Sequence, residues 1–128
     1  MKLLLDTHTF LWFIMGNPHL SATARTLIED QANEKVLSVA SLWEIAIKIS
    51  IGKLALSGSF DTLIPQQLNL NGFELLGLEV RHAAALIALP FHHRDPFDRL
   101  LIAQSIVEQM QIVSHDSIFD AYQVTRLW

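Results

Sequence analysis

The sequence contains no cysteine, which excludes disulfide bonds and metal sites built from thiolates. It also lacks any uncharged apolar stretch long enough to span a bilayer. The apolar start Leu3–Leu5 is interrupted by Asp6 and His8, and no signal-peptide cleavage site follows. Repeats, linkers and low-complexity segments are absent as well. We therefore expect a single cytoplasmic domain over residues 1–128, without membrane contact.

Basic residues are scarce too, with 9 Lys and Arg against 13 Asp and Glu and a net charge of −4. Nucleic-acid binders usually carry a basic excess, so the overall charge does not by itself favour that class. Hydrophobic residues, in contrast, make up 51% of the chain, and the mean hydropathy is +0.32. We expect some of this apolar surface to contact another chain, either a second copy or a different protein.

Short apolar segments alternate with longer helical patterns, which is typical of an α/β fold around a mostly parallel sheet. Strands are predicted over residues 2–5, 35–39, 73–76 and 112–114, with a weaker fifth strand over 122–127. Helices are predicted over residues 21–31, 41–51, 59–70, 80–89 and 96–110. Ser21 and Asp95 are expected N-caps, Gly52 and Pro90 end helices, and Pro65 marks a kink or a boundary.

Four acidic residues lie just past apolar segments or on apolar helices, far apart in the sequence: Asp6, Glu44, Asp98 and Asp116. Asp6 and Asp116 follow predicted strands, and Asp98 lies in the first turn of a predicted helix. Parallel strands bring their carboxyl ends to one edge of a sheet, where ligands bind. Carboxylates gathered there repel one another unless a cation holds them, and oxygen ligands select Mg²⁺ or Mn²⁺. The pattern therefore predicts a metal-dependent hydrolase.

The three aspartates also have local explanations. Asp6 could cap a helix starting near Thr7, and Asp116 could cap the short segment 117–119. Asp98 carries a negative charge in the first turn of a helix, where the macrodipole favours it. Any single aspartate is as well explained by capping as by metal binding, so the prediction depends on their combination.

Glu44 is the most diagnostic of the four acids because its helix is almost entirely apolar. Ser41, Glu44 and Lys48 form the only polar stripe of that helix, at helical spacing. An inward-facing glutamate is costly unless it is paired or binds a metal. Ser41 and Glu44 also match a capping box, and Glu44 with Lys48 is a favourable i,i+4 pair, so a salt bridge remains the alternative.

Several further residues are candidates for supporting roles. Asp95 ranks after Asp98 because its N-cap position already explains it, and Thr7 and Ser114 could support the aspartates beside them. Aromatic residues could stack on bases, although packing in the core or an interface is the favoured interpretation of Trp12, Phe13 and Trp43. Cationic residues near the site could contact phosphates: Lys48, Lys53, His92, His93, Arg94 and Arg99.

The segments around these acids resemble the PIN-domain family, and within it the VapC-type toxins of bacterial toxin–antitoxin pairs. The matching segments run in the family's order: LLLDTH at 3–8, SLWEIAIK at 41–48, HHRDPFDRLLIAQ at 92–104 and VSHD at 113–116. The family often has threonine where this chain has Ser114, and both residues carry a hydroxyl.

The resemblance implies a three-layer α/β/α sandwich that cleaves RNA with Mg²⁺ or Mn²⁺. The family's acidic quartet corresponds to Asp6, Glu44, Asp98 and Asp116. It also implies a homodimer inhibited by a VapB-like antitoxin.

Two other functions stay open at the level of sequence. A non-catalytic dimeric interaction module would account for the apolar composition and for acids that act only as caps. An aspartyl-phosphate phosphatase would use the aspartate after the first strand. Such phosphatases usually carry a second aspartate two residues later, and this chain has His8 there.

Overall fold

Five parallel strands form the central sheet of the computed structural model, which describes all 128 residues. The spatial order is β3-β2-β1-β4-β5, so β1 lies at the centre. Leu4 of β1 pairs with Val36 on one side and Ile112 on the other. The strands are β1 (Lys2–Leu5), β2 (Glu34–Ser38), β3 (Phe73–Leu76), β4 (Gln111–Val113) and β5 (Arg126–Leu127).

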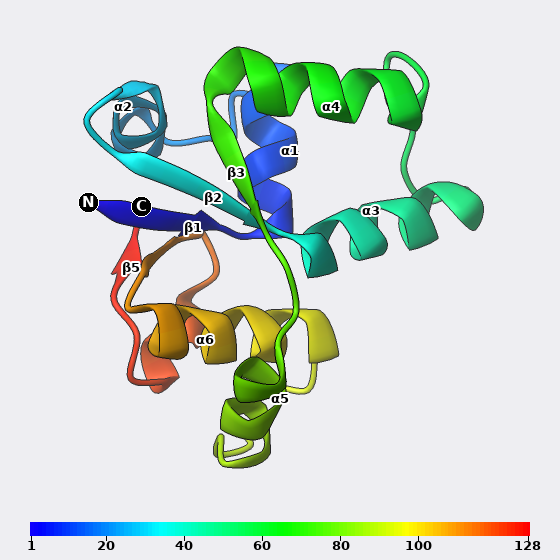
Figure 1. Cartoon of the computed structure of the whole chain (residues 1–128). Helices are drawn as coiled ribbons and strands as arrows, with labels where there is room; N and C mark the ends of the chain where they lie inside the picture. The colour runs from blue at the N-terminus through cyan, green and yellow to red at the C-terminus, as the bar shows by residue number, and fades with distance from the viewer.

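Helices cover both faces of the sheet, which gives the expected three layers (Figure 1). α1, α2 and α4 lie on one face, α5 and α6 lie on the other, and α3 leaves the sheet directly after β2 (Figure 1). None of these helices combines the length and the apolar character needed to cross a membrane. The helices are α1 (Thr7–Met15), α2 (Ala22–Glu29), α3 (Val39–Ser50), α4 (Phe60–Asn71), α5 (Val80–Ile87), α6 (Pro96–Glu108) and the short 3₁₀ helix η1 (Ser117–Ala121).

The central strand separates two hydrophobic cores. Leu3 and Leu5 belong to the larger core under α1, α2 and α4, whereas Leu4 packs with Leu101 of α6 on the opposite face. Successive side chains of a strand point to opposite faces, so three consecutive leucines serve both cores. All three leucines of β1 are fully buried. The carboxyl end of β1 is therefore held rigidly from both sides.

The start of α3 differs from the prediction. The helix begins at Val39 rather than Ser41, and Ser38 is the N-cap, since its hydroxyl accepts the Ala40 N–H at 3.1 Å. Ser41 therefore lies within the helix and forms no capping box with Glu44. Ser38 and Ser41 can both act as N-caps, so the local sequence does not distinguish them. Ser38 is the last residue of the buried strand β2, and the helix begins directly after it.

Other boundaries also moved. The segment 7–15, considered only as a helix that Asp6 could cap, is the full helix α1. Pro65 lies inside α4 and does not end it, and the helix continues to Asn71. The fifth strand is limited to Arg126–Leu127, because the preceding residues turn.

Candidate active site

The carboxyl ends of β1 and β4, together with the start of α6, bring three of the predicted aspartates into one cleft. This cleft has a volume of about 450 Å³. Asp6 follows β1, Asp116 follows β4, and Asp98 lies in the first turn of α6. The cleft is lined by Asp6, His8, Trp12, His93, Asp95, Asp98, His115, Asp116 and Ser117.

Asp6 is the buried member of the cleft, with 6% of its surface exposed. Its Oδ1 accepts the Thr9 N–H at 2.7 Å, which makes Asp6 the N-cap of α1. Its Oδ2 accepts the Ser114 hydroxyl at 2.5 Å. Burial raises the pKa of the Asp6 carboxyl, and the hydrogen bonds from Ser114 and Thr9 offset part of that rise. A buried carboxylate held in one orientation is suited to bind a cation.

Asp98 lies opposite, with its side chain 19% exposed and its Oδ2 at 2.8 Å from Nε2 of His93. Burial raises the pKa of Asp98 to about 6; the His93 hydrogen bond opposes this, and the charges of Asp95 and Asp6 add to it. The cleft therefore disfavours ionised Asp98 unless positive charge enters it.

Asp116 is exposed at the mouth of the cleft. Its Oδ1 accepts the Ile118 N–H at 3.0 Å and caps η1, and its own N–H donates to the Ser114 hydroxyl at 3.0 Å. Ser114 thus connects Asp6 to Asp116. One potential ligand atom from each of His93, Asp98 and Asp116 lies within 4.8 Å of the others. These atoms are close enough together for one cation to contact several of them.

Asp95 lines the same cleft but is occupied as the N-cap of α6. Its Oδ1 accepts the N–H groups of Phe97 at 2.8 Å and Asp98 at 3.2 Å. The preference for Asp98 over Asp95 as a ligand remains a prediction, consistent with this capping role.

Glu44 is buried beside the cleft but does not line it. Its Oε1 accepts the Thr7 hydroxyl at 2.7 Å, and its Oε2 is 3.1 Å from Nζ of Lys48. Ser41 Oγ is 3.0 Å from Thr7 Oγ1, which completes a buried polar cluster. Since Thr7 follows Asp6 directly, this cluster buttresses the chain that carries Asp6. Lys48 is engaged in the same cluster.

The residues expected to contact RNA are scattered. His93 alone lines the cleft, whereas Lys53, His92 and Arg94 are exposed outside it. Arg99 is the clear correction, since it is only 5% exposed and cannot present its charge to a ligand in solution.

The Arg99 guanidinium instead fixes the loop between α5 and α6. It donates to the carbonyls of Pro90 at 2.8 Å and Leu89 at 3.4 Å, and it lies 4.1 Å from the ring centroid of Phe91. It also contacts the Tyr122 hydroxyl at 3.3 Å. Arg99 follows Asp98 directly in sequence, but neighbouring residues of a helix point in different directions. The Arg99 side chain therefore points toward this loop.

Sequence reasoning missed two histidines of the cleft, His8 and His115. Each is exposed and lies one or two residues from an aspartate of the site. Their proximity to Asp6 and Asp116 in the sequence is the signal that could have identified them.

A second group of possible metal ligands lies between α5 and α6: Glu79, His82 and Glu108. The Glu79 backbone N–H donates to Nδ1 of His82 at 3.1 Å, so Nε2 carries the hydrogen of the neutral ring and has no lone pair for a metal. Arg81 already neutralises Glu108, with contacts of 2.7 and 2.8 Å. This group is better described as a structural cluster.

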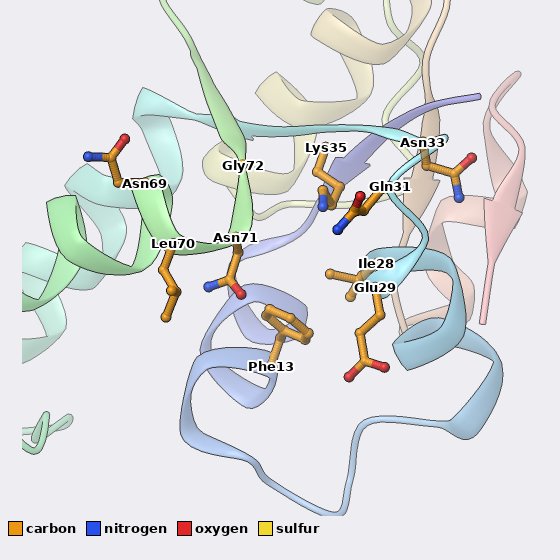
Figure 2. Close-up of a pocket in the computed structure, with 10 residues that line it drawn as sticks. All are labelled: Phe13, Ile28, Glu29, Gln31, Asn33, Lys35, Asn69, Leu70, Asn71 and Gly72. Atoms are coloured by element: carbon orange, nitrogen blue, oxygen red, sulfur yellow. The ribbon is translucent and has the colours of Figure 1, made fainter.

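Another pocket, of about 470 Å³, lies at the amino ends of β2 and β3. Figure 2 shows the Lys35 side chain pointing from β2 among amide side chains such as Gln31 and Asn71. α2 and α4 both end there, and a lysine suits the negative ends of two helix dipoles. The pocket holds one other charge, Glu29, so its chemistry does not match that of the aspartate cleft.

Comparisons with known proteins agree with this architecture. The family model described as "PIN domain" matches residues 3–124. Ribonuclease VapC16 of Mycobacterium tuberculosis is 33% identical over 72 residues, which cover 53% of this chain and 51% of the relative. The match thus spans about half the length of that curated protein.

Two solved structures share the fold at low sequence identity. VapBC2 from Rickettsia felis, bound to a promoter DNA fragment, has a TM-score of 0.74 at 16% identity, covering 99% of this chain and 98% of the other. DNA-bound VapBC from Salmonella typhimurium has a TM-score of 0.68 at 14% identity, with 99% and 97% covered.

Proposed function

Because this chain belongs to the PIN domain family, we propose that it is a metal-dependent endoribonuclease, the toxin of a VapBC-like toxin–antitoxin pair. One observation carries the proposal: Asp6, Asp98 and Asp116 meet in one cleft from three distant segments. Burial raises the pKa of both Asp6 and Asp98, because the ionised carboxylates are poorly solvated in the cleft. A bound cation would stabilise their ionised forms.

The donor set fits Mg²⁺ or Mn²⁺. Carboxylate oxygens suit both hard cations, and the nearby imidazole of His93 is tolerated better by Mn²⁺. When bound, the metal would lower the pKa of a water and polarise the phosphodiester that this water attacks. Asp6, Asp98 and Asp116 would hold the metal, while Glu44 would act through Thr7 rather than as a direct ligand.

The residues of the chain have distinct tasks in this scheme. Ser114 fixes the orientation of Asp6, and His93 holds the Asp98 carboxylate through its Nε2. Asp116 is the most exposed carboxylate of the cleft, and only its Oδ1 accepts a protein hydrogen bond, so its Oδ2 would orient the attacking water. These positions restrict the reacting groups to one geometry, which is a large part of catalysis.

The proposed partners are an RNA substrate, a VapB-like antitoxin and a second copy of the chain. Support comes from the names of the similar proteins and from large apolar side chains left on the surface. A cytoplasmic location goes with this proposal, because an RNA target is available there. The exposed apolar side chains include Trp43, Val80, Ile87 and Phe91, at 68%, 88%, 82% and 85%.

The test is RNA cleavage by antitoxin-free protein in the presence of Mn²⁺, Mg²⁺ or EDTA. Asp6→Asn and Asp116→Asn should abolish cleavage and keep the fold. Asp61→Asn, at an exposed position in the first turn of α4 outside the cleft, is the matched control. Cleavage that persists in EDTA or in both cleft variants would refute the proposal.

The non-catalytic module remains the second candidate, because Asp6, Asp95 and Asp116 each cap a helix in the structure. Thermal unfolding separates the two functions. A metal site predicts that Mn²⁺ raises the Tm of wild type but not of Asp6→Asn. A module whose aspartates act only as caps predicts no effect of Mn²⁺ on either protein.

A further inference from the structure

One wall of the aspartate cleft is made of rings rather than carboxylates. His8 and Trp12 project from α1, and His115 comes from the loop after β4. Trp12 is the one hydrophobic residue in the lining, and both histidines are exposed. A nucleotide combines an anionic phosphate, which a cation held by the carboxylates would attract, with a planar base, which could stack on the rings.

Trp12 organises this wall through aromatic contacts. Its ring centroid is 6.1 Å from that of His8 and 6.2 Å from that of His115. The ring centroid of Trp128, the residue after β5, is 5.9 Å from that of Trp12 and 5.5 Å from that of His115. His19 stacks on Trp12 with a centroid distance of 5.4 Å and an interplanar angle of 29°.

His115 is the ring best placed to accept a stacked base. Its contacts with Trp12 and Trp128 are edge-on, at 69° and 73°, so neither tryptophan stacks parallel to its face. No hydrogen bond or salt bridge in the structure engages its nitrogens. The next residue is Asp116, which carries one of the carboxylates of the site.

We propose that His115, supported by Trp12 and Trp128, stacks on a nucleobase of single-stranded RNA beside the phosphate to be cut. This inference rests on the proposed ribonuclease function and adds a positioning residue to it. The substrate must be unpaired at that nucleotide, because a base inside a duplex has no free face. The wall would supply affinity without a basic patch, which suits a chain with a net charge of −4.

The test is RNA binding without turnover. A fluorescein-labelled single-stranded RNA hexamer is titrated with metal-free protein in EDTA, and anisotropy gives the Kd. His115→Ala should weaken binding about five- to tenfold, the lower part of the range for losing one stacking ring. His115→Phe should restore binding, because phenylalanine keeps the ring and loses both nitrogens.

His19→Ala is the matched control, since His19 also packs on Trp12 but does not line the cleft. It should leave the Kd unchanged. Replacing each base of the hexamer in turn by an abasic ribose locates the stacked base. At one position the abasic change should weaken binding to wild type and have no further effect on His115→Ala.

The outcomes separate this inference from the proposed function. Equal Kd values for wild type and His115→Ala, or failure of His115→Phe to restore binding, would overturn the stacking role even if RNA is cleaved. A His115-dependent Kd without any metal-dependent cleavage would keep the stacking role and remove the nuclease. The stacking role would also be overturned if, at every position, the abasic change weakened binding to His115→Ala as much as it weakened binding to wild type.

Discussion

The Ser114 hydroxyl donates to Oδ2 of Asp6 at 2.5 Å, across 108 residues of sequence. Both side chains are buried, so this bond joins the ends of the neighbouring strands β1 and β4 in a water-poor environment. It also lowers the cost of a charge on Asp6, whose pKa burial raises. The hydroxyl is therefore as much a part of the site as the carboxylates.

Ser114→Ala should lower the free energy of unfolding by about 1–3 kcal/mol, because Asp6 loses a donor that buried carboxylates need. Ser114→Thr keeps the hydroxyl and should retain most of the stability. Urea denaturation of both variants measures this difference. Equal losses in the two variants would indicate that side-chain volume, rather than the hydroxyl, matters at this position.

Metal binding should weaken as the pH falls through about 6, the raised pKa of Asp98. The folded-state pKa lies above the unfolded value of 3.8, so without metal the Asp98 contribution to stability is present at low pH and is lost as the pH rises through about 6. A cation binds the ionised form and reverses that loss.

The measurement is the Mn²⁺-induced rise in Tm at about pH 5 and about pH 7.5, where Asp98 is mostly protonated and mostly ionised. The rise should be clearly larger at the higher pH. Asp98→Asn should reduce this pH dependence, and the part that remains reports on Asp6, whose pKa burial also raises. The idea fails if wild type shows the same rise at both pH values.

Thr7→Val should destabilise the protein by about 1–3 kcal/mol through Glu44, which keeps Lys48 but loses the donor to its Oε1. Valine matches threonine in shape, so packing is preserved. Thr7→Ser retains the hydroxyl and is the control. A stable Thr7→Val protein with normal Mn²⁺ binding would show that the Thr7–Glu44 contact is dispensable.

Arg99→Lys should lower the free energy of unfolding by about 2–3 kcal/mol, since a lysine cannot reproduce the guanidinium contacts with the carbonyls of Pro90 and Leu89. Lys53→Ala, at an exposed position, should leave stability unchanged. Thermal unfolding compares the two. A Tm for Arg99→Lys close to that of wild type would contradict a structural role for this arginine.

Local signals predicted most of the fold. The pair Asp95–Pro96 marks the start of α6, and Ser21 caps α2, because caps depend on residues within one turn of the helix. The central strand was predicted from its consecutive leucines. At the start of α3, both Ser38 and Ser41 could cap the helix. The structure uses Ser38, the last residue of the buried strand β2, so the predicted start at Ser41 was wrong.

The geometry of the site was less predictable. Asp6 and Asp116 were expected at one edge because parallel strands place their carboxyl ends together. Glu44 has one partner that was predicted, Lys48 at i,i+4. Its second partner, Thr7, was not predicted, because it is 37 residues away and only the tertiary arrangement of α1 and α3 joins the two. The burial of Arg99 was missed for the same reason, since sequence shows its charge but not the loop that folds over it.

The aspartate cleft also sets an order of events during folding. Asp6 and Ser114 are 108 residues apart, and the ring wall joins Trp12 to Trp128. Until β4 pairs with β1, Asp6 lacks the Ser114 hydroxyl as a donor and His115 is not in place beside it. A partly folded chain in which these two strands have not yet paired therefore lacks the complete cleft.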